Sequence, residues 1–206
     1  MTHTTKPVER PLSALDVIFS RRSVRAYTNA ALDKATVRAL LDAAVQAPTA
    51  LHAEPWAFIV IQDRNVLKRC SDAAKALWSA ELSHERDLHA IGEAAVGSHF
   101  AQEMANPEFS IFYDASTLII ICAKPMGPFV AADCWLAAEN LMLAACAMGL
   151  GTCCIGSAVG ALNTADIKKE LGVSPNVIAV APIIVGAPRD TAAPVLRKSP
   201  EVLCWK

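Results

Sequence analysis

The segment that most restricts the fold is an apolar run of 20 residues from Phe129 to Met148, FVAADCWLAAENLMLAACAM. A run of this length is long enough to span a bilayer. It contains Asp133, Glu139 and Asn140, however, and an acidic residue near the centre of a bilayer costs roughly 2.5–3.5 kcal/mol. We therefore interpret it as the central helix of a folded domain, buried on most sides, and expect no membrane association.

Short apolar runs on both sides of this helix predict strands. Residues 117–122, TLIIIC, form an unbroken run that is typical of a strand covered on both faces. WAFIVI at 56–61 and the short segment 152–155 are also predicted strands. The last is 177–185, where Pro182 indicates either a sheet edge or a bulge.

Capping residues predict where the helices begin. Ser13, with Asp16 three residues later, starts a short helix that ends close to Arg21, and Asp33 starts a second helix that ends near Ala47. The same criteria predict helices at 66–78 and at 164–171, the latter closed by Gly172. A tail over 187–206 is expected to be irregular. Strands and helices alternate without a regular βαβ rhythm, which predicts an α+β fold and a single domain over residues 1–206.

Composition excludes several classes of function. Nineteen Lys and Arg nearly balance 20 Asp and Glu, which argues against a nucleic-acid binder with a broad basic face. The seven cysteines are an odd number without C-x-x-C spacing, so we expect reduced thiols in a cytoplasmic protein rather than disulfides or zinc. The histidines lack the spacing of a metal site, and no metal is predicted.

The stretch RRSVRAY at 21–27 places three arginines within five residues. One interpretation is a solvated helix end, where cations interact favourably with the helix dipole. A second segment, GLGTCCIG at 149–156, fits neither a dinucleotide-binding fingerprint nor a phosphate loop. Its simplest interpretation is the end of a helix followed by a strand, with Gly156 allowing a flat group to approach the backbone.

Four segments in the same order and register resemble the nitroreductase family of FMN enzymes, from about Asp16 to Trp205. They are RRSVR, APTALHAEPWAF, AAENLMLAACAMGLGTCCIG and LRKSPEVLCW. The resemblance implies an α+β sandwich with a mixed central sheet flanked by helices. It also implies an intertwined homodimer with the long apolar helix at its interface and C-terminal arms that reach over the partner. Two FMN molecules would lie at the subunit boundary.

The resemblance also gives roles to the basic residues. Arg21 and Ser23 would hold the FMN phosphate and ribityl end, with Arg22 assisting, because guanidinium groups bind phosphate bidentately. Arg25 would lie near the pyrimidine edge of the flavin and raise its potential. The basic pair that completes the phosphate site would be Arg197 and Lys198.

Further FMN contacts are implied in the middle of the chain. The segment from Pro48 to Glu54 corresponds to a loop that the family contributes across the dimer interface. Thr49, His52 and Glu54 replace the usual serine, asparagine and glutamine. Contacts are expected from Pro48, Thr49, Ala50 and His52, and the backbone at Ile155 and Gly156 would face flavin N5.

The function implied by the resemblance is NAD(P)H-dependent reduction of nitroaromatics, quinones or similar acceptors by a ping-pong route. NADH or NADPH would be the electron donor. The flavin, rather than a side chain, would be the catalytic group. One alternative is another reaction on the same fold: flavin fragmentation, reductive dehalogenation or dehydrogenation. Another is a non-catalytic flavin-binding redox subunit.

Overall fold

The computed structural model describes residues 12–88, 96–124 and 127–206. Its sheet has four strands in the order β1-β2-β4-β3, and every neighbouring pair is antiparallel. Ser23 makes one isolated parallel bridge to Thr152 of β3, while the four described strands form no parallel pair with one another. The strands are β1 (Trp56–Ile61), β2 (Thr117–Ala123), β3 (Gly151–Cys154) and β4 (Ile178–Gly186).

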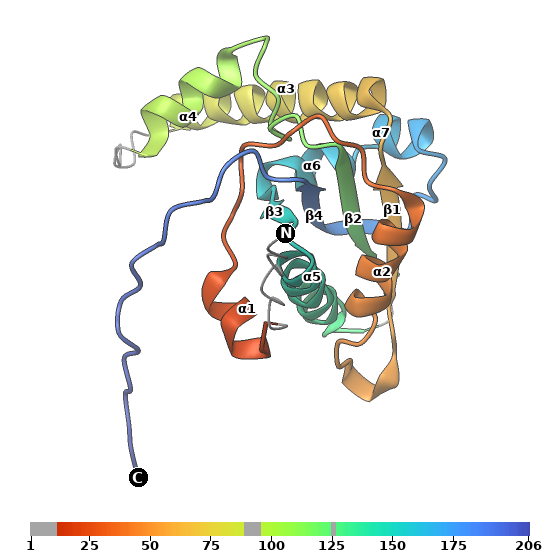
Figure 1. Cartoon of the computed structure of the whole chain (residues 1–206). Coiled ribbons are helices and arrows are strands. Elements are labelled where there is room, and N and C mark those ends of the chain that lie inside the picture. The colour runs from red at the N-terminus through yellow and green to blue at the C-terminus, as the bar shows by residue number, and fades with distance from the viewer. Residues whose placement is uncertain (1–11, 89–95, 125–126) are drawn as a thin grey trace, which may run out of the picture.

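Helices cover both faces of this sheet, as Figure 1 shows. They are α1 (Ala14–Ser20), α2 (Lys34–Ala44), α3 (Arg64–Leu88), α4 (Val96–Ala105), α5 (Val130–Ala147), α6 (Val159–Leu162) and α7 (Ala165–Glu170). Two short 3₁₀ turns are Ala50–His52 and Gly156–Ala158. The α+β sandwich predicted from the sequence is confirmed.

Alternation along β2 divides the interior into two cores. Ile119 and Ile121 join a core with α2 and α5, whereas Leu118 and Ile120 join a core with α3 and α6. All four side chains are fully buried, because side chains alternate between the faces of a strand and both faces of β2 are covered.

Local signals placed most helix starts correctly. Ser13 and Asp16 form the predicted capping box, and the Asp33 carboxylate accepts a hydrogen bond of 2.7 Å from the Thr36 N–H. Two predicted ends were wrong: α2 ends at Ala44 rather than near Ala47, and α3 runs on to Leu88. Beyond residue 78 the sequence is polar and weakly periodic, so its apolar pattern does not indicate that the helix continues.

Pro182 lies inside the sheet, so of the two predicted alternatives the edge is wrong and the bulge is right. Strand β4 lies between β2 and β3, and its register with β2 shifts between Ile121 and Cys122. The carbonyl of Pro182 accepts a hydrogen bond of 2.9 Å from the Ile155 N–H. The register shift skips Val180, two residues before Pro182, and Pro182 itself stays in register opposite Ile120.

Helix α5 ends as the sequence predicts. Gly149 adopts φ +73°, and the Leu150 N–H donates to the Ala145 carbonyl at 2.8 Å, which is the Schellman arrangement. The expectation that most sides of α5 are buried is wrong for a single chain, because only 39% of its residues are buried. By length and composition alone, α5 is the one helix among the described residues that could cross a membrane. A core helix meets the same criterion, and α5 packs on β2 and β4.

Candidate functional site

The arginine-rich segment runs beside the edge strand β3. The Val24 N–H donates to the Thr152 carbonyl at 2.9 Å, and Ser23 pairs with Thr152. Because side chains alternate along an extended chain, Arg21, Ser23 and Arg25 lie on one face of the segment. We call this row the arginine face.

A glycine in β3 allows this close pairing. A Cβ atom built on Gly151 would come within 2.8 Å of the Val24 side chain, which is closer than real contacts allow. Gly151 therefore brings the arginine-rich segment against the sheet, and the spacing between this segment and β3 depends on a residue without a side chain.

The arginines have different partners. Arg21 is mostly buried and its Nε lies 3.7 Å from the Glu139 carboxylate on α5. Arg22 turns back to α1 and donates from Nη1 to the carbonyls of Phe19, at 2.6 Å, and Arg21, at 2.8 Å. Among the described residues, its Nε is one of two buried polar side-chain atoms without a hydrogen-bond partner. The helix-end interpretation therefore describes Arg22 better than it describes the arginine face.

The arginine face leads to a cavity of about 130 Å³ at the end of β3. A Cβ atom on Gly156 would meet nothing within 4 Å, so the backbone there borders open space. The structure thus brings Arg25, Ile155 and Gly156 to one cavity, which we call the β3 cavity. Its lining residues are Arg25, Phe100, Ile111, Tyr113, Cys153, Cys154, Ile155, Gly156 and Ser157.

Burial and positive charge act in opposite directions on the titratable groups of this cavity. Burial raises the pKa of the Cys153 thiol, while Arg25, a hydrogen bond with Ser23 and Arg21 lower it. Burial also raises the pKa of Tyr113, and Arg25 lowers it. Both groups are neutral near pH 7, so neither compensates the positive charge of Arg25, whereas the Glu139 carboxylate partly compensates that of Arg21.

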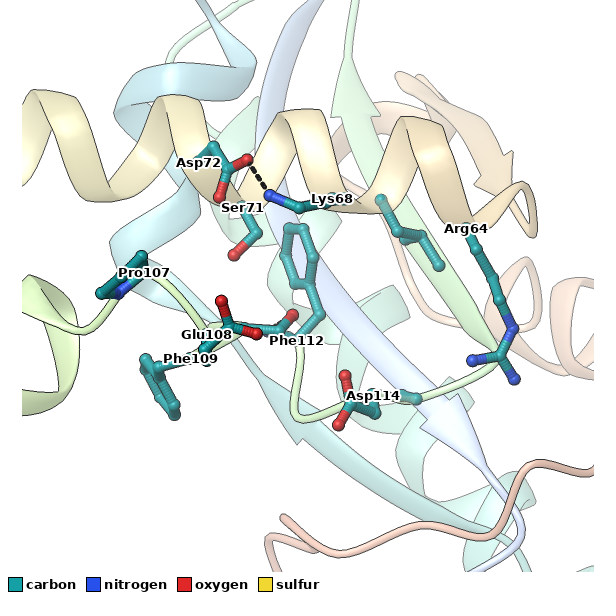
Figure 2. Close-up of a pocket in the computed structure, with 12 residues that line it drawn as sticks. Arg64, Lys68, Ser71, Asp72, Pro107, Glu108, Phe109, Phe112 and Asp114 are labelled. Atoms are coloured by element: carbon teal, nitrogen blue, oxygen red, sulfur yellow. Dashed lines mark hydrogen bonds and ion pairs between the residues drawn. The ribbon is translucent and has the colours of Figure 1, made fainter.

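The larger hollow lies elsewhere. It has a volume of about 230 Å³ between α3 and the chain from Pro107 to Ala115, and Figure 2 shows the side chains that surround it. Lys68 and Asp72 form an ion pair of 2.6 Å at its wall. None of the residues predicted to bind a cofactor lines this hollow, so we place the candidate site at the β3 cavity.

The predicted loop 48–54 lies beside the opposite end of α5 from the arginine-rich segment. The Ala50 N–H donates to the Asp133 carboxylate at 3.2 Å, in the first turn of α5. Ser20, next to the arginine-rich segment, contacts Cys146 in the last turn at 3.6 Å. These two contacts are 13 positions apart along the helix, about 20 Å at 1.5 Å per residue. Arg21 reaches back along α5 as far as Glu139, but no hydrogen bond or ion pair described within one chain joins the loop to the arginine face.

The C-terminal tail begins beside the arginine-rich segment and then leaves it. The Arg189 N–H donates to the Ala26 carbonyl at 2.9 Å, and Pro188 pairs with Tyr27. Beyond this point Arg197 and Lys198 are exposed and lie in no helix or strand, and Figure 1 shows the tail extending from the body. Within one chain the basic pair stays apart from the arginine face.

Sequence reasoning missed several residues of the β3 cavity. Phe100, Ile111 and Tyr113 come from α4 and the chain that follows it, and Glu139 was read only as a polar residue in the long helix. No spacing rule connects Tyr113 with Arg25, because they meet only through the tertiary fold. Cys153 and Cys154 were predicted only as reduced thiols, without a place in a site, and both line the cavity.

An α+β sandwich with a cationic row leading to an open cavity is suited to binding an anionic cofactor. The chain belongs to the nitroreductase family, an oxidoreductase family, whose defining pattern matches residues 18–186.

Similar proteins agree with this assignment. An Archaeoglobus fulgidus protein with the provisional name NADH dehydrogenase/NAD(P)H nitroreductase is 28% identical over 181 residues, covering 85% of this chain and 86% of that protein. An FMN-bound nitroreductase from Bacteroides fragilis superposes with a TM-score of 0.74 at 23% identity, covering 95% of this chain and 98% of that chain. An FMN-bound nitroreductase from Desulfitobacterium hafniense gives a TM-score of 0.75 at 19% identity, covering 94% and 98%.

Proposed function

We propose that the protein is an FMN-dependent NAD(P)H oxidoreductase that reduces nitroaromatics, quinones or similar acceptors by ping-pong hydride transfer. The chain would act as one FMN-binding domain over residues 1–206, within a cytoplasmic homodimer. The observation that carries this proposal is the arginine face, which leads from Arg21 to the β3 cavity.

The residues present fit a flavin phosphate ester. Its phosphate carries about −1.5 to −2 charges and strong acceptor oxygens, and Arg21, Ser23 and Arg25 offer donors along one face. Arg22 has a buried Nε without a partner and fixes the start of this face on α1. At the other end, Gly156 leaves the open space that a flat ring system requires.

When bound, FMN supplies the chemistry of taking hydride from a nicotinamide and passing electrons to an acceptor. The residues of the chain would bind and orient this cofactor. Arg21 and Ser23 would hold the phosphate and ribityl end, Arg25 would place a positive charge at the pyrimidine edge, and the backbone at Ile155 and Gly156 would border the flavin ring. Arg25 would thereby favour the more negative, reduced form.

A second copy of the chain supplies what one copy lacks. Trp135 and Leu136 on α5 are 43% and 46% exposed, and Phe19 on α1 is 74% exposed. Exposed apolar surface of this extent is typical of an interface. Pairing through α5 would let Pro48, Thr49, Ala50 and His52 of one copy meet the arginine face of the other, together with Arg197 and Lys198.

Flavin titration tests the binding site. We expect Arg25→Gln to raise the FMN Kd about tenfold or more, because a hydrogen bond to a charged group contributes about 1.5–3 kcal/mol. Arg38→Gln is a matched control, since Arg38 is an exposed arginine that pairs with Asp42 on α2. Equal FMN affinity in both variants would contradict the proposed role of Arg25.

Steady-state kinetics test the reaction. Parallel double-reciprocal lines with NADH or NADPH against nitrofurazone or a quinone would support the ping-pong route. Faster turnover of halogenated phenols than of nitrofurazone or a quinone would instead indicate reductive dehalogenation. Bound FMN without turnover of either nicotinamide would indicate a redox subunit, and a protein that takes up no FMN would end the proposal.

Sedimentation tests the dimer. Leu136→Glu places a charge on the exposed stripe of α5, and we expect it to yield a monomer that loses FMN. Val60→Glu is the control, because Val60 is 38% exposed on β1 and lies on neither α1 nor α5. A Leu136→Glu variant that remains dimeric and yellow would refute this interface.

A further inference from the structure

The chain after α4 carries Tyr113 into the β3 cavity in a strained conformation. Tyr113 and Asp114 have φ angles of +50° and +56°, a left-handed region that residues with a side chain rarely adopt. Two consecutive residues of this kind persist only where their surroundings hold them, and they are frequent at functional sites. We call residues 106–114 the tyrosine loop.

A buried lysine holds the tyrosine loop. The side chain of Lys75 on α3 is 9% exposed, and its Nζ donates to the carbonyls of Asn106 at 3.2 Å, Pro107 at 3.2 Å and Phe109 at 2.8 Å. Nζ also lies 3.5 Å from the Asp72 carboxylate. A buried ammonium is costly unless its donors are satisfied, so these bonds commit the loop to one path along α3. Figure 2 shows part of that path, from Pro107 to Asp114.

The loop in turn places the ring of Tyr113 against Arg25. The ring packs edge-on against Phe109, with centroids 5.5 Å apart and planes at 82°. The Arg25 guanidinium carbon lies 5.9 Å from the centroid of the Tyr113 ring, within the range of a cation–π contact. Arg25 is otherwise exposed, and Tyr113 restricts its guanidinium through this ring contact and through a side-chain hydrogen bond with the phenol.

We propose that Tyr113 is a positioning residue of the flavin site, whose ring holds the Arg25 guanidinium at the β3 cavity, and that Lys75 fixes the loop that carries it. The proposal rests on the proposed function only for the position of Arg25 beside the flavin. The contact between Tyr113 and Arg25 is a property of the protein itself and is tested without FMN.

The first experiment titrates tyrosine absorbance at 295 nm in the flavin-free protein. The chain has two tyrosines, and burial strongly raises the pKa of Tyr27, so Tyr113 titrates first, and Tyr113→Phe should remove that first transition. Burial raises the pKa of Tyr113, while the charge of Arg25 and its hydrogen bond with the phenol lower it, and the charges of Glu103 and Cys153 add to the increase. Arg25→Gln should therefore shift the titration to higher pH, and an unchanged midpoint would overturn the contact.

The second experiment measures the midpoint potential of the bound flavin. Tyr113→Leu removes the ring, and we expect the preference for reduced over oxidised FMN to fall about threefold to tenfold, in keeping with cation–π magnitudes. Tyr113→Phe keeps the ring and should retain most of the wild-type potential. Combining Tyr113→Leu with Arg25→Gln should lower the potential no further than Arg25→Gln alone. A full additional drop in the double variant would show that Tyr113 acts independently of Arg25.

The third experiment compares two lysines on α3. Lys75→Met keeps the length of the side chain but removes its donors, and should reproduce the potential of Tyr113→Leu. Lys68→Met is matched, because Lys68 also pairs with Asp72 but is exposed and makes no bond to the tyrosine loop. If Lys75→Met fails to fold, the Tyr113 variants still decide the main claim. If the wild-type protein does not bind FMN, the proposed function is wrong. The tyrosine titration in the flavin-free protein would still show whether Tyr113 contacts Arg25.

Discussion

At the scale of single residues, the two glycines Gly151 and Gly156 of the segment 149–156 have different structural roles. A side chain on Gly151 would collide with Val24 at 2.8 Å, whereas a side chain on Gly156 would meet nothing within 4 Å. Gly151 is therefore required by the protein's own packing. Gly156 borders the β3 cavity, where a methyl group would meet only a bound ligand.

This difference gives a prediction that separates folding from binding. We expect Gly151→Ala to lower the free energy of unfolding by about 1–3 kcal/mol, the usual cost of overpacking. Gly156→Ala should leave that free energy nearly unchanged and raise the FMN Kd. Urea unfolding of flavin-free protein and FMN titration measure the two effects. Equal destabilisation by both substitutions would contradict the described packing.

The sequence could predict site residues only where a short stretch of neighbouring residues indicates them. The sequence indicated Arg25 and Gly156 through short motifs, and the structure brings both to one cavity. Tyr113 was not predicted, because 87 residues separate it from Arg25 and its backbone conformation depends on Lys75 and the loop around it. Arg22 was grouped with its neighbours, but alternation along the extended segment turns it back to α1.

At the scale of elements, α5 organises both halves of the proposed site. Its first turn holds the loop 48–54 through Asp133, which is 4% exposed. Leu51, His52 and Glu54 in that loop all have positive φ angles, so the loop stores strain that its contacts must offset. Asp133, one of the polar residues that argued against a membrane helix, thus accepts a hydrogen bond from the Ala50 N–H in this loop.

Removing that partner should loosen the loop. We expect Asp133→Ala to lower the free energy of unfolding by about 1–3 kcal/mol, because the Ala50 N–H loses its acceptor. FMN affinity should fall as well if the loop completes the site of a second copy. Asp133→Asn is the matched control, since its amide oxygen still accepts the bond. Chemical denaturation and flavin titration of both variants measure the effects, and equal losses would mean that the charge, not the hydrogen bond, matters.

Elements with strong periodicity were predicted well, and those that depend on tertiary contacts were not. Strand β2 and helix α5 follow from unbroken apolar runs, and the caps of α1 and α2 follow from Ser13 and Asp33. Helix α6 was missed because four residues carry no readable period. The continuation of α3 beyond residue 78 was missed because its sequence is polar and weakly periodic.

At the scale of the whole molecule, cysteines lie in both cores and none of the described ones is paired. Burial raises the pKa of Cys70 to about 11 and of Cys122 to about 12, from an ordinary value of 9.0. The same cause raises the pKa of Cys134 to about 11. Cys70 and Cys122 belong to the core under α3, and Cys134 to the core under α5.

These thiols predict how stability depends on alkaline pH. Above pH 9 the unfolded chain loses thiol protons that the folded chain keeps, so folding binds more protons and the free energy of unfolding falls as pH rises. The stabilisation is complete below pH 9 and is lost between about pH 9 and 12, with a limiting slope of about 1.4 kcal/mol per pH unit for each thiol. Urea unfolding with a reductant at pH 8, 9 and 10 measures this slope. Cys134→Ala should make it shallower, whereas Cys204→Ser, at an exposed position, should not; identical slopes in both variants would show that core thiols do not govern alkaline stability.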